Sequence, residues 1–179
     1  MRHDDIVHKV DSCGYRVFLT TSFYFNVSTC EAVLNADKSE TKDFIYVWNH
    51  LMSECENYDL SRAKLVFVPI KDGAHYFVYC FNFIHKRIDV LDSNDYFLNC
   101  SNQEERHKAV FAKIPIIDAA FQKVSNLKLP RVSKWRRPFI DVPKQEGQSD
   151  CLFFVWKYME YYDGDKMTKE NNPVSHAVN

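Results

Sequence analysis

The stretch DVPKQEGQSDC, residues 141–151, leads directly into the apolar run LFFVW at residues 152–156. The glycine and serine in this stretch indicate a turn, and the apolar residues that follow recur with the period of a helix. We expect the side chain of Ser149 or Asp150 to accept hydrogen bonds from the free amides of the first helical turn. The sequence therefore predicts that Cys151 lies at the start of a helix.

A cysteine at the start of a helix is a candidate nucleophile. The free amides and the helix dipole favour an anion there, so the thiolate is populated at neutral pH when a cation such as protonated histidine lies nearby. The helix is predicted to be apolar nearly all round, which is typical of a helix at the centre of a domain. Its predicted core stripe is Cys151, Phe154, Val155, Tyr158, Met159 and Tyr162, with Leu152, Phe153 and Trp156 on the other side.

Three other stretches show the periodicity of regular elements. Residues 41–58 carry apolar side chains at three- and four-residue steps, which predicts a helix. Residues 64–70 are apolar and rich in β-branched side chains, which predicts a buried strand with Pro69 at an end or an edge position. Residues 104–124 are predicted to be mainly helical, with an interruption at Pro115.

Two more strands are predicted on either side of a short connection. In residues 75–83 the side chains alternate between two apolar faces, which indicates a strand covered on both sides. Residues 87–92 follow as a strand that returns antiparallel beside it. His75 opens the first of these strands and Asp92 closes the second, so antiparallel pairing brings the two side chains together.

The residues at these element ends are those that thiol-dependent hydrolysis requires. This chemistry needs a thiolate, a histidine that holds it as an ion pair and later protonates the leaving amine, and a carboxylate that orients the imidazole. Cys151, His75 and Asp92 are the candidates for these roles. Gln145, just before the helix, is a candidate donor to the developing oxyanion, together with the backbone amide of Cys151.

Each of these residues also has an ordinary structural interpretation. A cysteine in an apolar context is usually a small buried residue, and a histidine at a strand end usually has a structural role. Asp92 precedes Ser-Asn-Asp and could cap a turn, whereas Gln145 could be solvated in its polar loop. The occurrence of all four in a compatible order is what favours a catalytic site.

Length and composition limit the class of protein. The 179 residues predict one domain over 1–179, with a loose polar tail at 165–179. A formal net charge of −1 provides no basic field for nucleic acid. The six cysteines include no Cys-x-x-Cys pair, so we expect a reducing compartment and no zinc site. No membrane span or signal peptide is recognised, so we expect an intracellular protein.

The motifs carry a resemblance to a known family. They are FVPI at residues 67–70, His75 at the head of a strand, VLDS at 90–93, then Gln145 and the pair Asp150-Cys151. In this order they resemble the ubiquitin-like-protein-specific proteases, the SUMO (sentrin) deconjugating cysteine peptidases related to adenovirus protease. The end of the cysteine helix is similar to that of plant members.

The resemblance covers about residues 22–164 and implies a fold, an activity and a set of site residues. The fold would be α+β, of the papain-like or adenain type, with a small central mixed sheet flanked by helices and the nucleophile at the start of a buried helix. His75 would be the base, Asp92 its orienting carboxylate, Gln145 the oxyanion donor and Cys151 the nucleophile. The activity would be hydrolysis after the C-terminal glycine of SUMO or another ubiquitin-like modifier, without a cofactor.

The same resemblance implies that the partners are a ubiquitin-like modifier and its protein conjugates. We expect a monomer in the nucleus or cytoplasm that binds neither nucleic acid nor a membrane.

Three departures from the family pattern leave other functions open. The family usually has Trp after the histidine and Gly after the cysteine, where this chain has Tyr76 and Leu152, and no counterpart of its Trp-Leu-x-Asp stretch precedes Val17. One alternative is a catalytically impaired domain that binds a modifier or partner, and another is acyl transfer by the same residues.

Overall fold

The computed structural model describes residues 15–94, 103–147 and 149–168 of the chain. After the first strand come two helices, then three consecutive strands and then three helices, so the fold is α+β as predicted. In chain order the elements are β1 (Arg16–Phe18), α2 (Thr21–Thr29), α3 (Lys42–Glu54), a 3-10 turn (Leu60–Arg62), β2 (Leu65–Asp72), β3 (His75–Asn82), β4 (Arg87–Leu91), α4 (Gln103–Phe111), α5 (Ile114–Val124) and α6 (Cys151–Tyr161).

The strands form one four-stranded mixed sheet in the order β1-β2-β3-β4. β1 runs parallel to β2, and the other neighbours are antiparallel, so the predicted return of the β4 strand beside β3 is confirmed. Pro69 pairs with Val78 of β3 but lies beyond residues 65–67, the part of β2 that pairs with β1. Because a proline has no N–H to donate, this locally unpaired side of β2 is where it is tolerated.

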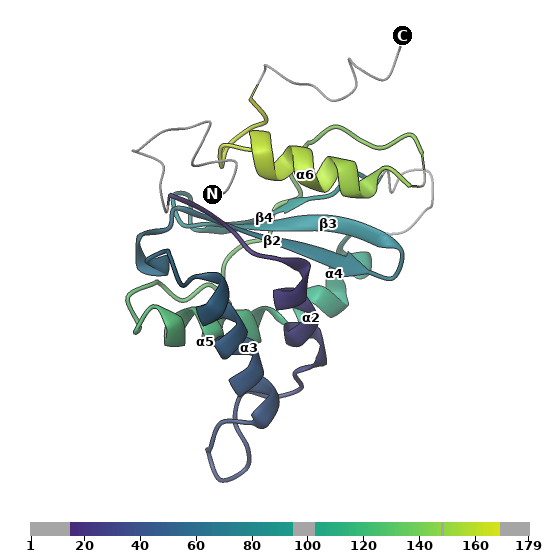
Figure 1. Cartoon of the computed structure of the whole chain (residues 1–179). Coiled ribbons are helices and arrows are strands. Elements are labelled where there is room, and N and C mark those ends of the chain that lie inside the picture. The colour runs from purple at the N-terminus through teal and green to yellow at the C-terminus, as the bar shows by residue number, and fades with distance from the viewer. Residues whose placement is uncertain (1–14, 95–102, 148, 169–179) are drawn as a thin grey trace.

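Helices cover both faces of the sheet. Figure 1 shows α6 alone on one face and α2, α3, α4 and α5 on the other. Side chains of β3 alternate between these layers, as the sequence predicted. Phe77, Tyr79 and Phe81 join the core under the four helices, whereas Val78 and Cys80 join the core under α6. The sheet is therefore buried on both sides, and its strand ends are the places where polar side chains meet solvent.

The predicted helices are present with changed boundaries. The first is α3, which is shorter than the predicted 41–58, and its start is capped by the Thr41 hydroxyl, which accepts from the Phe44 amide at 3.1 Å. The predicted stretch at 104–124 is two helices, α4 and α5, separated at Ala112 and Lys113. Pro115 lies in the first turn of α5, where the missing N–H of a proline has no helical partner to lose.

Two expectations about α6 are wrong. The helix is not buried all round, because Leu152, Phe153 and Trp156 are 56%, 46% and 54% exposed. Only one side of α6 faces the sheet, and these three side chains lie on the opposite side. The side chain of Asp150 also makes no capping hydrogen bond, because its backbone is helical rather than extended. Its carboxylate instead folds back over Gly147, where an added Cβ would lie 2.8 Å from Oδ2.

The C-terminal end of α6 is anchored to the sheet. The Arg16 guanidinium of β1 donates to the carbonyl oxygens of Met159, Glu160 and Tyr162, which satisfies acceptors at the end of the helix. The Tyr162 hydroxyl donates to Asp89 Oδ2 at 2.9 Å. Burial raises the pKa of the Asp89 carboxyl. These contacts fix the direction of the helix that carries Cys151 at its other end.

Residues 165–168, where the loose tail was predicted to begin, return along the end of α6. The Thr168 amide donates to the Tyr161 carbonyl at 3.0 Å, and Tyr162 and Met167 form an isolated β-bridge. The rest of that predicted tail lies outside the described residues. Within the part of the chain that the structure describes, no helix has the length and apolar character needed to cross a membrane.

Candidate active site

His75 and Asp92 form a hydrogen-bonded pair at one edge of the sheet. His75 is the first residue of β3, and Asp92 directly follows β4, whose register places Leu91 opposite Val78. The imidazole Nε2 lies 2.7 Å from Asp92 Oδ1. The side chains are 12% and 2% exposed, so this charge-assisted hydrogen bond is largely shielded from water. The hairpin therefore brings together the two residues that the sequence placed at neighbouring strand ends.

Cys151 lies against the start of β3. Its Sγ is 3.9 Å from the carbonyl oxygen of Ala74, the residue just before His75, and the cysteine is 4% exposed. Among the described residues, no hydrogen bond joins the thiol to His75. Because Asp92 occupies Nε2, the imidazole nitrogen left for the thiol is Nδ1. The structure thus places the cysteine beside the histidine without closing the contact, as is common in unliganded sites.

Gln145 is held next to Asp92 rather than against the cysteine. Its backbone amide donates to the Ser93 carbonyl at 2.8 Å, and its side-chain Oε1 accepts from the Ser93 hydroxyl at 2.6 Å. Its Nε2 donates to the Gly147 carbonyl at 3.0 Å, which leaves the second hydrogen of the amide for another acceptor. In the described part of the chain, Gln145 forms no hydrogen bond with Cys151.

The loop that carries Gln145 is fastened on two sides. Lys144 Nζ donates to the Asp92 carbonyl oxygen at 2.8 Å, which ties the loop to the end of β4. The Tyr158 hydroxyl of α6 donates to the Pro143 carbonyl oxygen. Burial and then the charge of Asp92 raise the pKa of Tyr158, so this phenol remains a donor at all ordinary pH values. The loop, the strand end and the cysteine helix are therefore held as one unit.

One participant was missed by the sequence reasoning. Asp92 Oδ2 lies 3.1 Å from Nε2 of His107 on α4, and His107 Nδ1 lies 2.8 Å from the Tyr79 hydroxyl. His107 is fully buried. A signal was present, because His107 precedes Val110 and Phe111 by three and four residues and so lies on the apolar face of a predicted helix. The contact itself joins separate elements, and local periodicity does not show it.

The other described cysteines are not engaged in disulfides and have settings unlike that of Cys151. Burial raises the pKa of the Cys80 thiol well above its usual range, and Cys80 lies inside the sheet, away from the strand ends. Burial, and then the charge of Asp43, raises the pKa of Cys30. Cys13 and Cys100 lie outside the described residues. Neither Cys30 nor Cys80 is therefore placed to act as a nucleophile at neutral pH.

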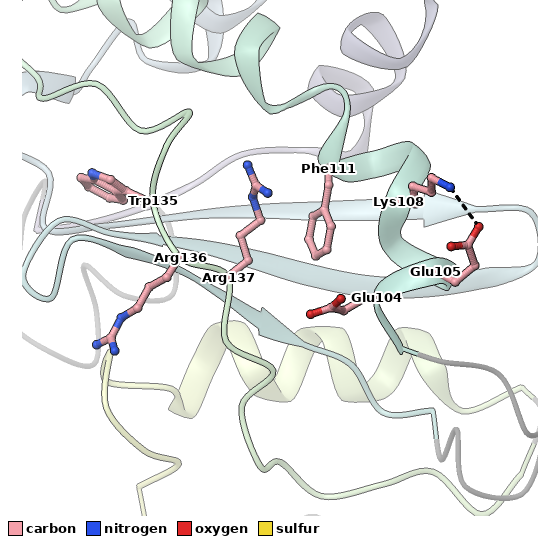
Figure 2. Close-up of a pocket in the computed structure, with 7 residues that line it drawn as sticks. All are labelled: Glu104, Glu105, Lys108, Phe111, Trp135, Arg136 and Arg137. Carbon is pink, nitrogen blue, oxygen red and sulfur yellow. Dashed lines mark hydrogen bonds and ion pairs between the residues drawn. The ribbon is translucent and has the colours of Figure 1, made fainter.

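An open cavity of about 470 Å³ lies next to α4, on the face of the sheet opposite α6 (Figure 2). None of the four predicted site residues lines it. Figure 2 shows that Arg136 and Arg137 point in opposite directions, with the Arg137 guanidinium 5.1 Å from the centre of the Phe111 ring. The arginines therefore do not converge on one anion. The cavity is lined by Glu104, Glu105, Lys108, Phe111, Trp135, Arg136 and Arg137.

The arrangement of sheet, helices and strand ends is that of an α+β cysteine peptidase domain. The Ulp1 protease family, C-terminal catalytic domain, matches residues 15–176, and the chain belongs to this family. A comparison with curated protein sequences found no match.

Solved structures with similar folds include Ulp1 proteases. The Ulp1 protease domain in complex with Smt3, the yeast ortholog of SUMO, is 16% identical with a TM-score of 0.60, over 89% of this chain and 62% of that one. SUMO protease Ulp1 with its catalytic cysteine oxidised to a sulfenic acid has a TM-score of 0.59 at 16% identity, over 90% and 63%. The Ulp1-like SUMO protease catalytic domain of Chaetomium thermophilum has a TM-score of 0.53 at 12% identity, over 87% and 53%. The chain thus spans less than two thirds of the length of these structures.

Proposed function

We propose that this chain hydrolyses the peptide or isopeptide bond that follows the C-terminal glycine of SUMO or another ubiquitin-like modifier. The observation that carries the proposal is the His75–Asp92 pair beside Cys151, in a chain of the Ulp1 protease family. The proposal treats residues 1–179 as one catalytic domain. The modifier and its conjugates are the proposed partners, because the similar solved structure holds Ulp1 with a SUMO protein.

The proposed reaction has two halves, and each uses side chains of this chain. The Cys151 thiolate attacks the carbonyl carbon of the terminal glycine, and the amide of Gln145 donates to the oxyanion that forms. The intermediate collapses to a thioester as His75 gives its proton to the leaving amine. A water molecule then attacks the thioester while His75 takes its proton, and the C–S bond breaks, which releases the modifier carboxylate and restores the Cys151 thiolate beside protonated His75. Asp92 orients the imidazole in both halves.

The test is covalent capture with a panel of modifiers. The intact chain is incubated with SUMO, ubiquitin and other ubiquitin-like proteins that each carry a C-terminal electrophile. We expect a SUMO-type probe to form an adduct, and peptide mass analysis should locate it on Cys151. Adducts on Cys80 or Cys30, or no adduct with any probe, would contradict the proposal. Binding of a modifier without capture would favour the non-catalytic alternative.

Leu152 provides a prediction about access to the nucleophile. It directly follows Cys151 at a position where the family usually has glycine. Because Leu152 is 56% exposed, Leu152→Gly loses little burial and should cost about 1 kcal/mol in helix propensity. We expect turnover of a fluorogenic modifier to rise, because removal of the bulky side chain next to Cys151 gives the substrate carbonyl more room to approach, and a change of ~1 Å in position can change the rate by about a hundredfold.

The matched control is Phe153→Gly, which removes another exposed apolar side chain from the same helical turn, at a smaller cost in propensity but with the loss of the ring contact to Phe154. It should lower the melting temperature as Leu152→Gly does without raising turnover. If folded Leu152→Gly is no faster than a variant that lacks the thiol, crowding by Leu152 does not limit the reaction.

A further inference from the structure

The second oxygen of the Asp92 carboxylate has its own histidine. Oδ1 binds Nε2 of His75, and Oδ2 lies 3.1 Å from Nε2 of His107. We infer that His107 is a positioning residue of this site: it holds the Asp92 carboxylate in the orientation in which Oδ1 meets His75. The inference rests on the proposed function, in which His75 is the base, and it adds a residue that the family motifs do not include.

Each hydrogen bond between Tyr79 and His75 pairs a donor with an acceptor. An ionised carboxylate only accepts, so Nε2 of His107 carries the proton that faces Asp92. The Nδ1 of a neutral His107 is then an acceptor, and the Tyr79 hydroxyl 2.8 Å away is its donor. The Tyr79 hydroxyl thereby matches the tautomer that the Asp92 carboxylate requires, and His107 in turn keeps a donor on Asp92. These hydrogen bonds connect Tyr79 in the core, through His107 and Asp92, to His75 at the edge of the sheet beside Cys151.

Packing holds the His107 ring in one place. The residue is fully buried. Its ring centroid lies 4.6 Å from that of Phe77 and 5.2 Å from that of Phe139, both in edge contacts, and 5.8 Å from that of Phe111. A ring enclosed by aromatic neighbours has few alternative rotamers, so its N–H keeps a fixed direction. The packing of α4 thereby fixes the orientation of the Asp92 carboxylate, which in turn orients His75.

A further donor to Asp92 comes from the backbone and binds the oxygen that His75 also binds. The Asn94 amide donates to Oδ1 at 2.9 Å, the same oxygen that binds His75. It therefore stabilises the carboxylate without fixing rotation of the carboxylate plane by itself. His107 acts on the other oxygen, and two contacts on opposite oxygens define that plane.

His107→Phe tests the inference, because it keeps an aromatic ring among the same neighbours and removes the donor. We expect kcat to fall about 10- to 100-fold, with KM nearly unchanged. A loss of this size is typical when a side chain that orients a metal-binding residue through a hydrogen bond is removed. His107→Gln retains an N–H donor and should recover most of kcat. His50→Gln, which changes a histidine on α3 paired with Glu54, is the matched control and should leave kcat unchanged.

A second measurement separates this inference from the proposed function. In protein with ¹⁵N-labelled histidine, the His75 ring N–H that faces Asp92 should shift or broaden in His107→Phe and return in His107→Gln. This signal needs no substrate, so it decides the inference even if the chain cleaves no modifier. A folded His107→Phe with unchanged kcat and an unchanged His75 signal would overturn it. If His107→Phe does not fold, His107→Leu serves instead, because it also lacks a donor for Asp92 Oδ2, and an unchanged His75 signal in that variant would also overturn the inference.

Discussion

Cys151→Ala should reduce turnover of a fluorogenic modifier to the background rate, a loss of about 10⁴- to 10⁶-fold, comparable to removal of the nucleophile in other triad enzymes. The physical reason is that no other described thiol lies at the start of β3. The Cys151 Sγ contacts the Ala74 carbonyl, next to His75, whereas Cys80 lies inside the sheet. Single-turnover kinetics measure the loss, and binding of an intact conjugate should persist because the alanine leaves the surface unchanged.

The matched control for this prediction is Cys55→Ala. Cys55 is 5% exposed, close to the 4% of Cys151, but it follows α3 in the other layer. The two variants remove the same atom from equally buried positions, so their stability costs should be similar. Turnover by Cys55→Ala should match that of the unmodified chain. Measurable turnover by a folded Cys151→Ala, well above background, would show that another group is the nucleophile.

Asp92→Asn should lower kcat by about 10³- to 10⁴-fold with a smaller effect on folding. Both His75 and His107 donate an Nε2 proton to the Asp92 carboxylate. An amide has one acceptor oxygen and one donor group, so it satisfies only one of them. If the NH₂ faces His75, the proton moves to Nδ1, which is the nitrogen that must accept from Cys151. The amide also fails to stabilise the imidazolium that forms during the reaction.

Asp89→Asn is the matched control for this second prediction. Asp89 is an equally buried aspartate three residues earlier, and it binds Arg87, Asn82 and the Tyr162 hydroxyl rather than a histidine. Its replacement should lower the melting temperature, and because Arg16 still anchors the end of α6, the folded fraction should keep most of its turnover. Asp92→Asn should instead lower turnover strongly, with a smaller change in melting temperature. Similar kcat values for the two folded variants would argue against Asp92 as the orienting carboxylate.

Much of the layout of the site was predictable because it depends on neighbours in sequence. Alternation along β3 and the return of β4 follow from local pattern, and together they place His75 beside Asp92. The start of α6 at Cys151 also follows from the turn before it and the apolar period after it. The catalytic roles of these residues, and that of Gln145, stay predictions for the experiments above.

Errors in prediction arose where a contact depends on another layer. The apolar character of Leu152, Phe153 and Trp156 predicted burial, but burial requires something on the far side of α6, and the sheet covers only one side. The Asp150 cap failed because the backbone there is already helical, which turns its carboxylate toward Gly147. Composition shows which residues can be buried, but not which faces receive a partner.

The sequence by itself determined the order of the two paired strands and the cysteine helix that carry the site, the two-faced β3 strand and the placement of His75, Asp92 and Cys151 at element ends, because periodicity and turn chemistry act over a few residues. Only the tertiary structure decided that His107 of α4 meets Asp92, and that Arg16 and Asp89 hold the end of α6. Such contacts join residues on different elements, and their partners are selected by how the layers pack. A side chain's hydrogen-bonding groups are visible in the sequence, whereas the direction in which the fold points them is not.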